Sequence, residues 1–382
     1  MKNLSTVLVL VALMATSCRS AIPSIFNRKT PHETYADKLE DRDLDKTPAG
    51  QAWLEASRRA VTAPHAVDVP YSHAGQFHAD KARALGLRFT AKKGEKVSFT
   101  VRKQPATGFV IYADLYRVAG TEAVHLHAAD TAATGFSIDI EETGNYVLRL
   151  QSELFRAGKY TLQISSGPSL SFPVSGKANI GSFWGDERDG GKRRHEGIDI
   201  FAPRKTPLMA AADGVITSVR EGGIGGKTVW LRPSGKNYSL YYAHLDQQHV
   251  REGQFVKAGE IIGTVGNTGN ARTTPPHLHF GIYTHQGAVD PLPFVKRVQQ
   301  TPSPLPAKDL PALVRVTKNH RAQPGKTIKA RSVFVPVAMT AKGYLSEMPD
   351  GTLVTIPFSA AKPVTFREMT RLTGDSNGSG GS

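Results

Sequence analysis

Cysteine is nearly missing from this chain, because Cys18 is the only one among its 382 residues. A single cysteine cannot form an internal disulfide, so a disulfide-stapled fold is excluded. Hydrophobic residues are not scarce: they make up 40% of the chain and include 16 Phe and 11 Tyr. This composition is sufficient for real hydrophobic cores, and the length predicts a globular protein of two to four domains.

Acidic residues are scarce relative to basic ones. The chain has 48 Lys and Arg against 33 Asp and Glu, which gives a formal net charge of +15. Such a charge bears on the partners of a protein more than on its fold. Nucleic acid, anionic lipid and an anionic cell wall are the classes of partner that it favours.

The apolar run at the N-terminus is too short for a comfortable membrane-spanning helix. It covers residues 4–14, and small residues ending in Cys18 follow it, which predicts a secretory signal over residues 1–18. The position of Cys18 resembles a bacterial lipoprotein signal, although Ala15 stands where that signal usually has leucine. We therefore expect an exported protein of the bacterial cell envelope, in the periplasm or at the outer membrane, lipid-anchored through Cys18 or simply secreted, and with no nucleic-acid partner.

Changes of pattern divide the chain into seven segments, and the expected fold class is mainly β. The expected boundaries are 1–18 for the signal peptide, 19–66 for a tether and helical segment, 67–175 for a β-sandwich domain, 176–298 for a Gly-rich antiparallel β domain, 299–312 for a Pro-rich linker, 313–373 for a small SH3-like β module, and 374–382 for a disordered tail.

Local patterns carry these assignments. Alternating runs such as "LRFTAKKGEKVSFTVRK" and "GNYVLRLQSE", broken by Gly turns, predict the short strands of a jelly-roll-like sandwich. Between residues 31 and 61, strong helix formers with apolar residues at loose helical spacing predict one or two short helices. The segment "QQTPSPLPAKDLPAL" is typical of an extended linker.

The tripeptide His-Leu-His occurs twice, with His125 and His127 in one copy and His277 and His279 in the other. Residues two apart in a strand point to the same face, so strand geometry alone allows either pair to converge on one point. A catalytic zinc site needs three protein ligands and one open position. Around the first pair only Asp130 is near in sequence, so we interpret that pair as exposed strand residues.

The second pair has histidine and carboxylate partners upstream. His195 and Asp199 lie four apart in "HEGIDI", where Gly197 and the neighbouring isoleucines favour a loop that runs into a strand rather than a helix. His244 follows the Tyr-Tyr-Ala run of a further predicted strand. The region therefore supplies enough candidate ligands for a metal centre.

Five segments in this region resemble the lysostaphin/LytM-type zinc endopeptidases in both order and separation: "HEGID", "AAADGVITSV", "YYAHL", "VREGQFVKAGEIIGTVGNTGN" and "PPHLHF". The resemblance covers residues 193–290. It implies a compact antiparallel β core with a narrow groove whose floor carries the metal, so residues 176–298 are expected to be a zinc endopeptidase domain. Carried over residue by residue, it implies His195, Asp199 and His279 as metal ligands, and His244 and His277 as catalytic histidines that do not bind the metal.

The chemistry of these residues fits that division. Two neutral imidazoles and one carboxylate leave Zn²⁺ with a residual positive charge, which acidifies a bound water. His277 is held beside His279, and His244 approaches from another strand. One of these two histidines accepts the water proton and the other stabilises the oxyanion or protonates the leaving amine, and the sequence leaves open which does which. The N/O ligand set suits one Zn²⁺ per chain and leaves Co²⁺ and Mn²⁺ open.

The resemblance implies an exported zinc-dependent metalloendopeptidase that hydrolyses peptide cross-links of bacterial peptidoglycan. The basic charge agrees with this substrate, because wall polymers carry carboxylates and phosphates. The bond remains open, since a D-Ala to diamino-acid cross-link and a glycine bridge both fit a narrow groove. The alternative is a non-catalytic regulator or activator of other cell-wall hydrolases, although such relatives lack ligand residues that this chain keeps. Cell-wall and divisome proteins are the candidate protein partners.

Three further features have two interpretations each. The Gly-rich segments 222–226 and 266–270 are either groove walls or plain hairpin turns. Arg193 and Arg194 form either a solvated basic turn or an attraction site for a peptide carboxylate. The long region ahead of the peptidase-like segment is either a spacer or a cover that keeps the enzyme latent.

Overall fold

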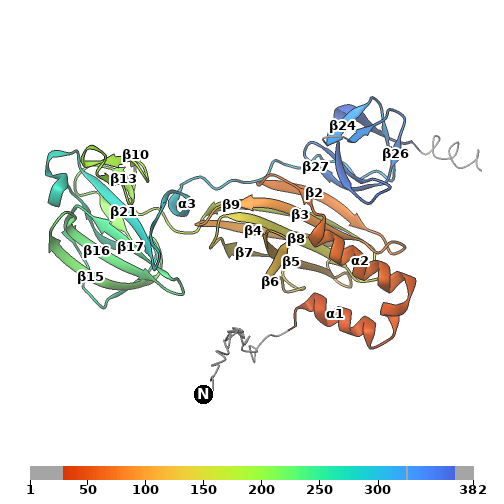
Figure 1. Cartoon of the computed structure of the whole chain (residues 1–382), viewed down its shortest axis with the longest axis horizontal. Coiled ribbons are helices and arrows are strands. Elements are labelled where there is room, and N and C mark those ends of the chain that lie inside the picture. Colours follow the sequence, from red (N-terminus) through yellow and green to blue (C-terminus); the bar gives the residue numbers. More distant parts are fainter. Residues whose placement is uncertain (1–28, 324–325, 366–382) are drawn as a thin grey trace, which may run out of the picture.

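The computed structural model describes residues 29–323 and 326–365 (Figure 1). Strands and a few short helices build this part of the chain, so the expected mainly β fold class is confirmed. The expected signal peptide 1–18, with Cys18, and the expected tail 374–382 lie outside the described residues. None of the helices in the described part combines the length and the apolar character that crossing a membrane requires.

The helices are short, and two of them open the described chain, as predicted for residues 31–61. They are α1 (Pro31–Glu40), α2 (Pro48–Thr62) and α3 (Leu292–Val295), with 3₁₀ turns η1 (Leu44–Lys46), η2 (Asp189–Gly191), η3 (Gly269–Thr273) and η4 (Phe358–Ala360). Helix α1 begins with a capping box, in which the Thr30 hydroxyl accepts from the Glu33 backbone N–H and the Glu33 carboxylate accepts from the Thr30 N–H.

Two sheets form the predicted sandwich. The first sheet has the order β1 (His65–Ala66), β3 (Ala84–Ala91), β8 (Gly144–Ser152), β5 (Ile111–Ala119) and β6 (Glu122–Ala128). The second sheet has the order β29 (Leu353–Pro357), β28 (Gly343–Glu347), β27 (Pro336–Thr340), β2 (Tyr71–Phe77), β9 (Gly158–Pro168), β4 (Glu95–Gln104) and β7 (Gly135–Asp139). Alternate residues of both sheets, such as Leu87, Phe99 and Leu148, are buried in the shared core.

The C-terminal strands extend the second sheet of the sandwich. Strand β27 pairs with β2 in antiparallel register, with Ala74 opposite Met339, and β28 and β29 continue outward from it. The remaining strands of this region are β23 (Val314–Val316), β24 (His320–Gln323), β25 (Lys326–Ile328), β26 (Val333–Phe334) and β30 (Ala361–Pro363). Residues expected to form a separate module thus share a sheet with the sandwich, and the SH3-like description stays a prediction.

The segment that resembles the zinc endopeptidases forms its own sheets at the other end of the molecule (Figure 1). The main sheet has the order β10 (Asn179–Ser182), β13 (Ile198–Phe201), β21 (His277–Thr284), β17 (Tyr238–Ala243), β16 (Gly226–Pro233), β15 (Gly214–Gly222) and β19 (Phe255–Val256), with β22 (Gly287–Val289) on β21. A smaller sheet contains β14 (Pro207–Met209), β20 (Ile261–Val265) and β18 (Leu245–Gln248), and a hairpin contains β11 (Glu187–Arg188) and β12 (Arg193–Arg194).

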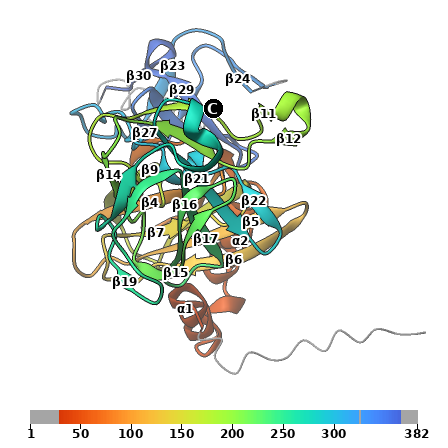
Figure 2. The same ribbon diagram turned by 90° about the vertical axis from the view of Figure 1, so that its left-hand side faces the viewer.

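An ion pair connects this domain to the sandwich. The Lys236 ammonium lies 2.7 Å from the carboxylate of Asp139 on β7 of the sandwich. After α3 the chain returns along the sandwich, and residues 301–312 contain neither helix nor strand. Figure 2 views the molecule from the peptidase end, with the β11–β12 hairpin projecting at its edge.

Candidate metal centre and catalytic groove

Three neighbouring strands bring the predicted site residues together. Strand β21 lies between β13 and β17, so that Asp199 and Ala243 are the Cα partners of His279 on its two sides. Leu278 and Phe280 are fully buried in the core of the domain, each contributing about 1.5–3 kcal/mol by burial. Their alternation with the histidines turns His277 and His279 to the opposite face of the sheet, toward the groove.

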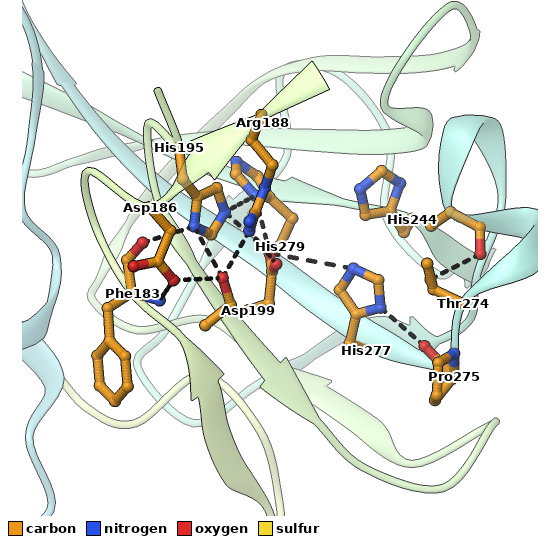
Figure 3. Close-up of polar contacts among 12 residues, drawn as sticks. Phe183, Asp186, Arg188, His195, Asp199, His244, Thr274, Pro275, His277 and His279 are labelled. Carbon is orange, nitrogen blue, oxygen red and sulfur yellow. Dashed lines mark hydrogen bonds and ion pairs between the residues drawn. The ribbon is translucent and has the colours of Figure 1, made fainter. Parts of the chain in front are cut away.

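Three donor atoms converge on one point at this face (Figure 3). His195 Nε2 lies 2.9 Å from His279 Nδ1 and 3.0 Å from Asp199 Oδ1, and His279 Nδ1 lies 3.1 Å from Asp199 Oδ1. Ligand atoms of a tetrahedral zinc site are separated by about 3.3 Å, so the donor set fits one such ion. Within the described ranges, no other group of three such side chains meets the same criterion.

The surroundings prepare these side chains as ligands. His195 Nδ1 lies 2.8 Å from the Phe183 carbonyl oxygen, which only accepts, so Nδ1 carries the proton and Nε2 is free to bind a metal. Burial opposes the charge on Asp199, but the close contacts with His195 and His279 outweigh it and hold the pKa of that carboxyl well below its usual value. The site therefore offers one carboxylate oxygen and two imidazole nitrogens as ligands.

His244 and His277 flank this triangle and point toward it (Figure 3). Their ring centroids lie 5.1 Å apart, and His277 Nε2 is 4.0 Å from Asp199 Oδ1. Each ring donates its Nδ1–H to a backbone carbonyl, His244 to Thr268 at 2.9 Å and His277 to Pro275 at 2.8 Å. Both Nε2 atoms therefore remain available as proton acceptors.

Burial, reinforced by the neighbouring His277 and His279, lowers the pKa of His244 to about 4. A histidine with this pKa is neutral at physiological pH. His244 can consequently take up a proton during a reaction rather than enter it already protonated.

Close-packed glycines position the wall that holds His244. A Cβ built on Gly226 would lie 2.4 Å from the Gly269 backbone nitrogen, and both glycines have positive φ. The two Gly-rich segments therefore lie against each other, and Lys227 and His244 both bond to Thr268 between them. Side chains at these glycines would push the loops apart, which gives the Gly-rich segments a role beyond that of plain turns.

The groove around these residues has a volume of 760 Å³. Its lining comes from residues 182–283 alone, so no described residue of the helices or the sandwich covers it. Arg193 and Arg194 are exposed and line the groove, and Arg194 Nη1 lies 3.2 Å from Glu187 Oε1.

Sequence reasoning did not identify Arg188. Its guanidinium Nη2 donates to Asp199 Oδ2 at 2.9 Å and to Ser182 Oγ at 2.5 Å. Arg188 lies eleven residues before its partner, at the end of the short strand β11, and neither period-2 nor helical spacing relates the two. Its position directly before the β11–β12 turn is the only local signal, and that signal does not reveal the contact.

A groove on an antiparallel β sheet with a His-Asp-His donor set and two flanking histidines defines the metallopeptidase class. The model of Peptidase family M23 matches residues 193–291. The chain belongs to peptidase family M23, of the lysostaphin/LytM type, through this domain. The resemblance seen in the motifs is thereby confirmed.

Several characterised proteins are similar to this part of the chain. The L-Ala–D-Glu endopeptidase of Bacillus subtilis is 35% identical over 140 residues, which are 34% of this chain and 43% of the relative. The DD-carboxypeptidase/endopeptidase Mpg of Neisseria meningitidis is 44% identical over 101 residues, 26% of this chain and 22% of the relative. The solved catalytic domain of lysostaphin from Staphylococcus simulans is 34% identical, with 31% of this chain and 92% of that domain covered and a TM-score of 0.29. The chain spans less than half the length of the curated relatives it matches.

Proposed function

We propose that this protein is an exported zinc-dependent endopeptidase that hydrolyses peptide cross-links of bacterial peptidoglycan. One observation carries the proposal: the ligand atoms of His195, Asp199 and His279 all lie within 4.8 Å of one another. Two further histidines lie beside them in the groove. Membership of family M23 supports the same reaction class. The B. subtilis and N. meningitidis relatives are named as endopeptidases, which supports a peptide bond of the wall as the substrate.

In this proposal His195, Asp199 and His279 hold one Zn²⁺. When bound there, the metal acts as a Lewis acid that lowers the pKa of a water molecule and polarises a carbonyl. The Phe183 carbonyl fixes the tautomer of His195, so that Nε2 faces the ion. Asp199 contributes the single negative charge among the three ligands.

His244 and His277 perform the proton transfers. Both are held by backbone carbonyls in the tautomer whose Nε2 accepts a proton. One of them takes a proton from the nucleophilic water, and the other supports the developing oxyanion or returns a proton to the leaving amine. His277 lies on β21 and His244 follows β17, which supports an approach of the two histidines from different strands.

The cell envelope is the place where this substrate occurs. An exported protein with a net charge of +15 meets wall polymers that carry carboxylates and phosphates, so its charge favours encounter with them. Lipid attachment through Cys18 would keep the enzyme near the membrane while its groove reaches the wall. Cell-wall and divisome proteins would be neighbours at that place.

Incubation of the protein with purified sacculi of both cross-link types tests the proposal. We expect new peptide ends in the released muropeptides by mass spectrometry, lost with a chelator and strongly reduced in His277→Ala. The cross-link type that is cut identifies the bond. Zinc-loaded protein that cuts neither type would overturn the proposal and favour the regulator alternative.

A further inference from the structure

We propose that Arg188 is a positioning residue that holds Asp199 as a one-oxygen metal ligand and thereby keeps the fourth coordination position open. The inference rests on the proposed metal site, and it adds a residue that the donor triangle itself does not contain. Arg188 does not reach the converging atoms. It acts through Asp199.

The two oxygens of the Asp199 carboxylate have separate partners. Oδ1 lies in the donor triangle, 3.0 Å from His195 Nε2 and 3.1 Å from His279 Nδ1. Oδ2 lies outside the triangle, 2.9 Å from Arg188 Nη2. A charge-assisted hydrogen bond from a guanidinium to one oxygen fixes the orientation of the carboxylate and directs the other oxygen to the metal position. Without this contact, rotation about the side chain would allow both oxygens to bind and would fill a position that water or substrate needs.

The loop that carries Arg188 also supports a second ligand. Ser182 Oγ accepts from Arg188 and donates to the Asp186 carboxylate at 3.0 Å, and this carboxylate also accepts from the Phe183 N–H at 2.7 Å. The Phe183 carbonyl in turn accepts from His195 Nδ1. Segment 182–188 therefore supports His195 and Asp199 together, and Figure 3 shows both ligands against this loop.

Backbone hydrogen bonds attach segment 182–188 to the stretch of chain that carries His195. The His195 N–H donates to the Asp186 carbonyl at 2.8 Å, and the Gly185 N–H donates to the His195 carbonyl at 2.9 Å. Strands β11 and β12 pair through Arg188 and Arg193, which places the Arg188 backbone directly beside the approach to His195. The guanidinium Nη2 contacts both Ser182 and Asp199, and the Arg188 side chain is 30% exposed, so the ion pair is partly shielded from solvent.

Charge gives Arg188 a second effect on the same ligand. Its positive charge draws electron density from the carboxylate, so Asp199 neutralises less of the charge of a bound metal. The open position and the stronger residual charge both favour activation of a bound water. Partners in the outer shell of metal sites typically change metal affinity by about 10- to 100-fold when they are lost.

The test compares the full chain with Arg188→Ala, Arg188→Lys and, as a matched control, Arg251→Ala, an exposed arginine in a loop of the same domain. Zinc affinity is measured by competition with a chromophoric chelator. The coordination number is read from the visible absorption of the Co²⁺-loaded protein, which is intense for four-coordinate and weak for higher-coordinate Co²⁺. Neither readout needs peptide hydrolysis, so failure of this inference and failure of the proposed function are distinguishable.

We expect Arg188→Ala to bind zinc about 10- to 100-fold more weakly and to show weaker Co²⁺ absorption. Arg188→Lys, which keeps one donor and the charge, should lie between Arg188→Ala and the wild type, and Arg251→Ala should match the wild type. Unchanged zinc affinity and Co²⁺ absorption in Arg188→Ala would overturn the inference. If activity alone fell, Arg188 would be a substrate contact. If Arg188→Ala does not fold, Arg188→Lys and Ser182→Ala carry the same test with the same two outcomes.

Discussion

The same trio of His, Asp and Arg is assembled twice in this molecule, once in the peptidase domain and once on the sandwich. In the peptidase domain Asp199 offers Oδ1 to histidines and Oδ2 to Arg188. On the sandwich Asp114 offers Oδ1 to His125 at 3.3 Å and Oδ2 to Arg149 at 2.8 Å. The two clusters have the same carboxylate chemistry, yet only one of them has the geometry of a metal centre.

The two His-Leu-His pairs differ in geometry because β6 contains a β-bulge and β21 does not. On β21 the register is regular, so His277 and His279 share a face. On β6 the register shifts, so His125 is opposite Tyr116 and His127 is opposite Leu115, which are consecutive residues of β5. Consecutive residues point to opposite faces of a sheet, and so do the two histidines. His125 lies beside Tyr116, whereas His127 contacts Phe136 of the other sheet with tilted rings, 4.6 Å between the centroids.

The two clusters also differ in their exposure to solvent. Asp114 is 2% exposed, and its partner Arg149 donates to Ser57 of helix α2. The sandwich cluster therefore attaches the N-terminal helices to the sheet, whereas the peptidase cluster opens into a groove. The comparison shows that a ligand motif becomes a site only where three donors converge and one side stays open.

Removal of a proposed ligand should have the largest effect. His279→Ala leaves two of the three donors, and we expect loss of the bound zinc and of all measurable peptide release. His127→Ala, the matched change in the other His-Leu-His, should keep both. Zinc content by elemental analysis and muropeptide release check the pair, and retained zinc in His279→Ala would break the comparison.

Removal of a flanking histidine should separate catalysis from metal binding. We expect His277→Ala and His244→Ala to keep zinc while kcat falls by about 10²- to 10⁴-fold, the usual contribution of a general acid or base. His125→Ala is the control and should leave kcat unchanged. A fall in zinc affinity equal to that of His279→Ala would show instead that these histidines are ligands.

Removal of the sandwich arginine should destabilise the fold without touching the metal. Arg149→Ala removes the arginine from the buried Asp114 carboxylate and leaves it only the His125 contact, which costs about 3–5 kcal/mol of unfolding free energy. Denaturant unfolding measures this loss, and zinc affinity should stay at the wild-type value. Arg188→Ala should show the reverse pattern, with a stability loss of at most about 1 kcal/mol because its ion pair is partly exposed. Equal stability losses in the two variants would remove the distinction between the clusters.

Acid should weaken the attachment of the N-terminal helices through His32, a buried residue of α1 whose Nε2 lies 2.7 Å from Gln151 Oε1 on β8. Burial and the charge of Arg149 lower the pKa of His32 to about 4, below the value of about 6.5 in the unfolded chain. The unfolded state therefore binds more protons between these values, so the stability is present above pH 6.5 and is lost as the pH falls toward 4. We expect about 2 kcal/mol to be lost between pH 7 and pH 5. The difference in unfolding free energy between the wild type and His32→Gln should shrink as the pH falls over this interval. A difference that stays constant with pH would contradict the assignment.

The sequence predicted those parts of the site that depend on local periodicity. His277 and His279 share a face because a regular strand places residues two apart on the same side. The bulge in β6 has no local signature, so the equal geometry expected for both pairs was wrong for His125 and His127. The interpretation of that first pair as strand residues is confirmed, although His127 is half-buried rather than exposed.

Long-range contacts were not predictable for a related reason. Arg188 meets Asp199 only once the loop before His195 has folded, and Asp114 meets His125 only through strand pairing. The pairing of β27 with β2 joins residues more than 250 positions apart. The alternation of apolar and polar residues predicts that β2 and β27 are strands, but it carries no information about which strand lies beside which.

Stepwise return of zinc to chelator-treated protein tests the central claim most directly, with bound metal and muropeptide release measured on the same samples. The account predicts that peptide release from sacculi rises in proportion to bound zinc and stops rising at one ion per chain. It also predicts that His279→Ala neither binds the ion nor releases peptides, while His127→Ala follows the wild-type curve. Full zinc occupancy of the wild-type site without release of peptides from any sacculus would contradict it.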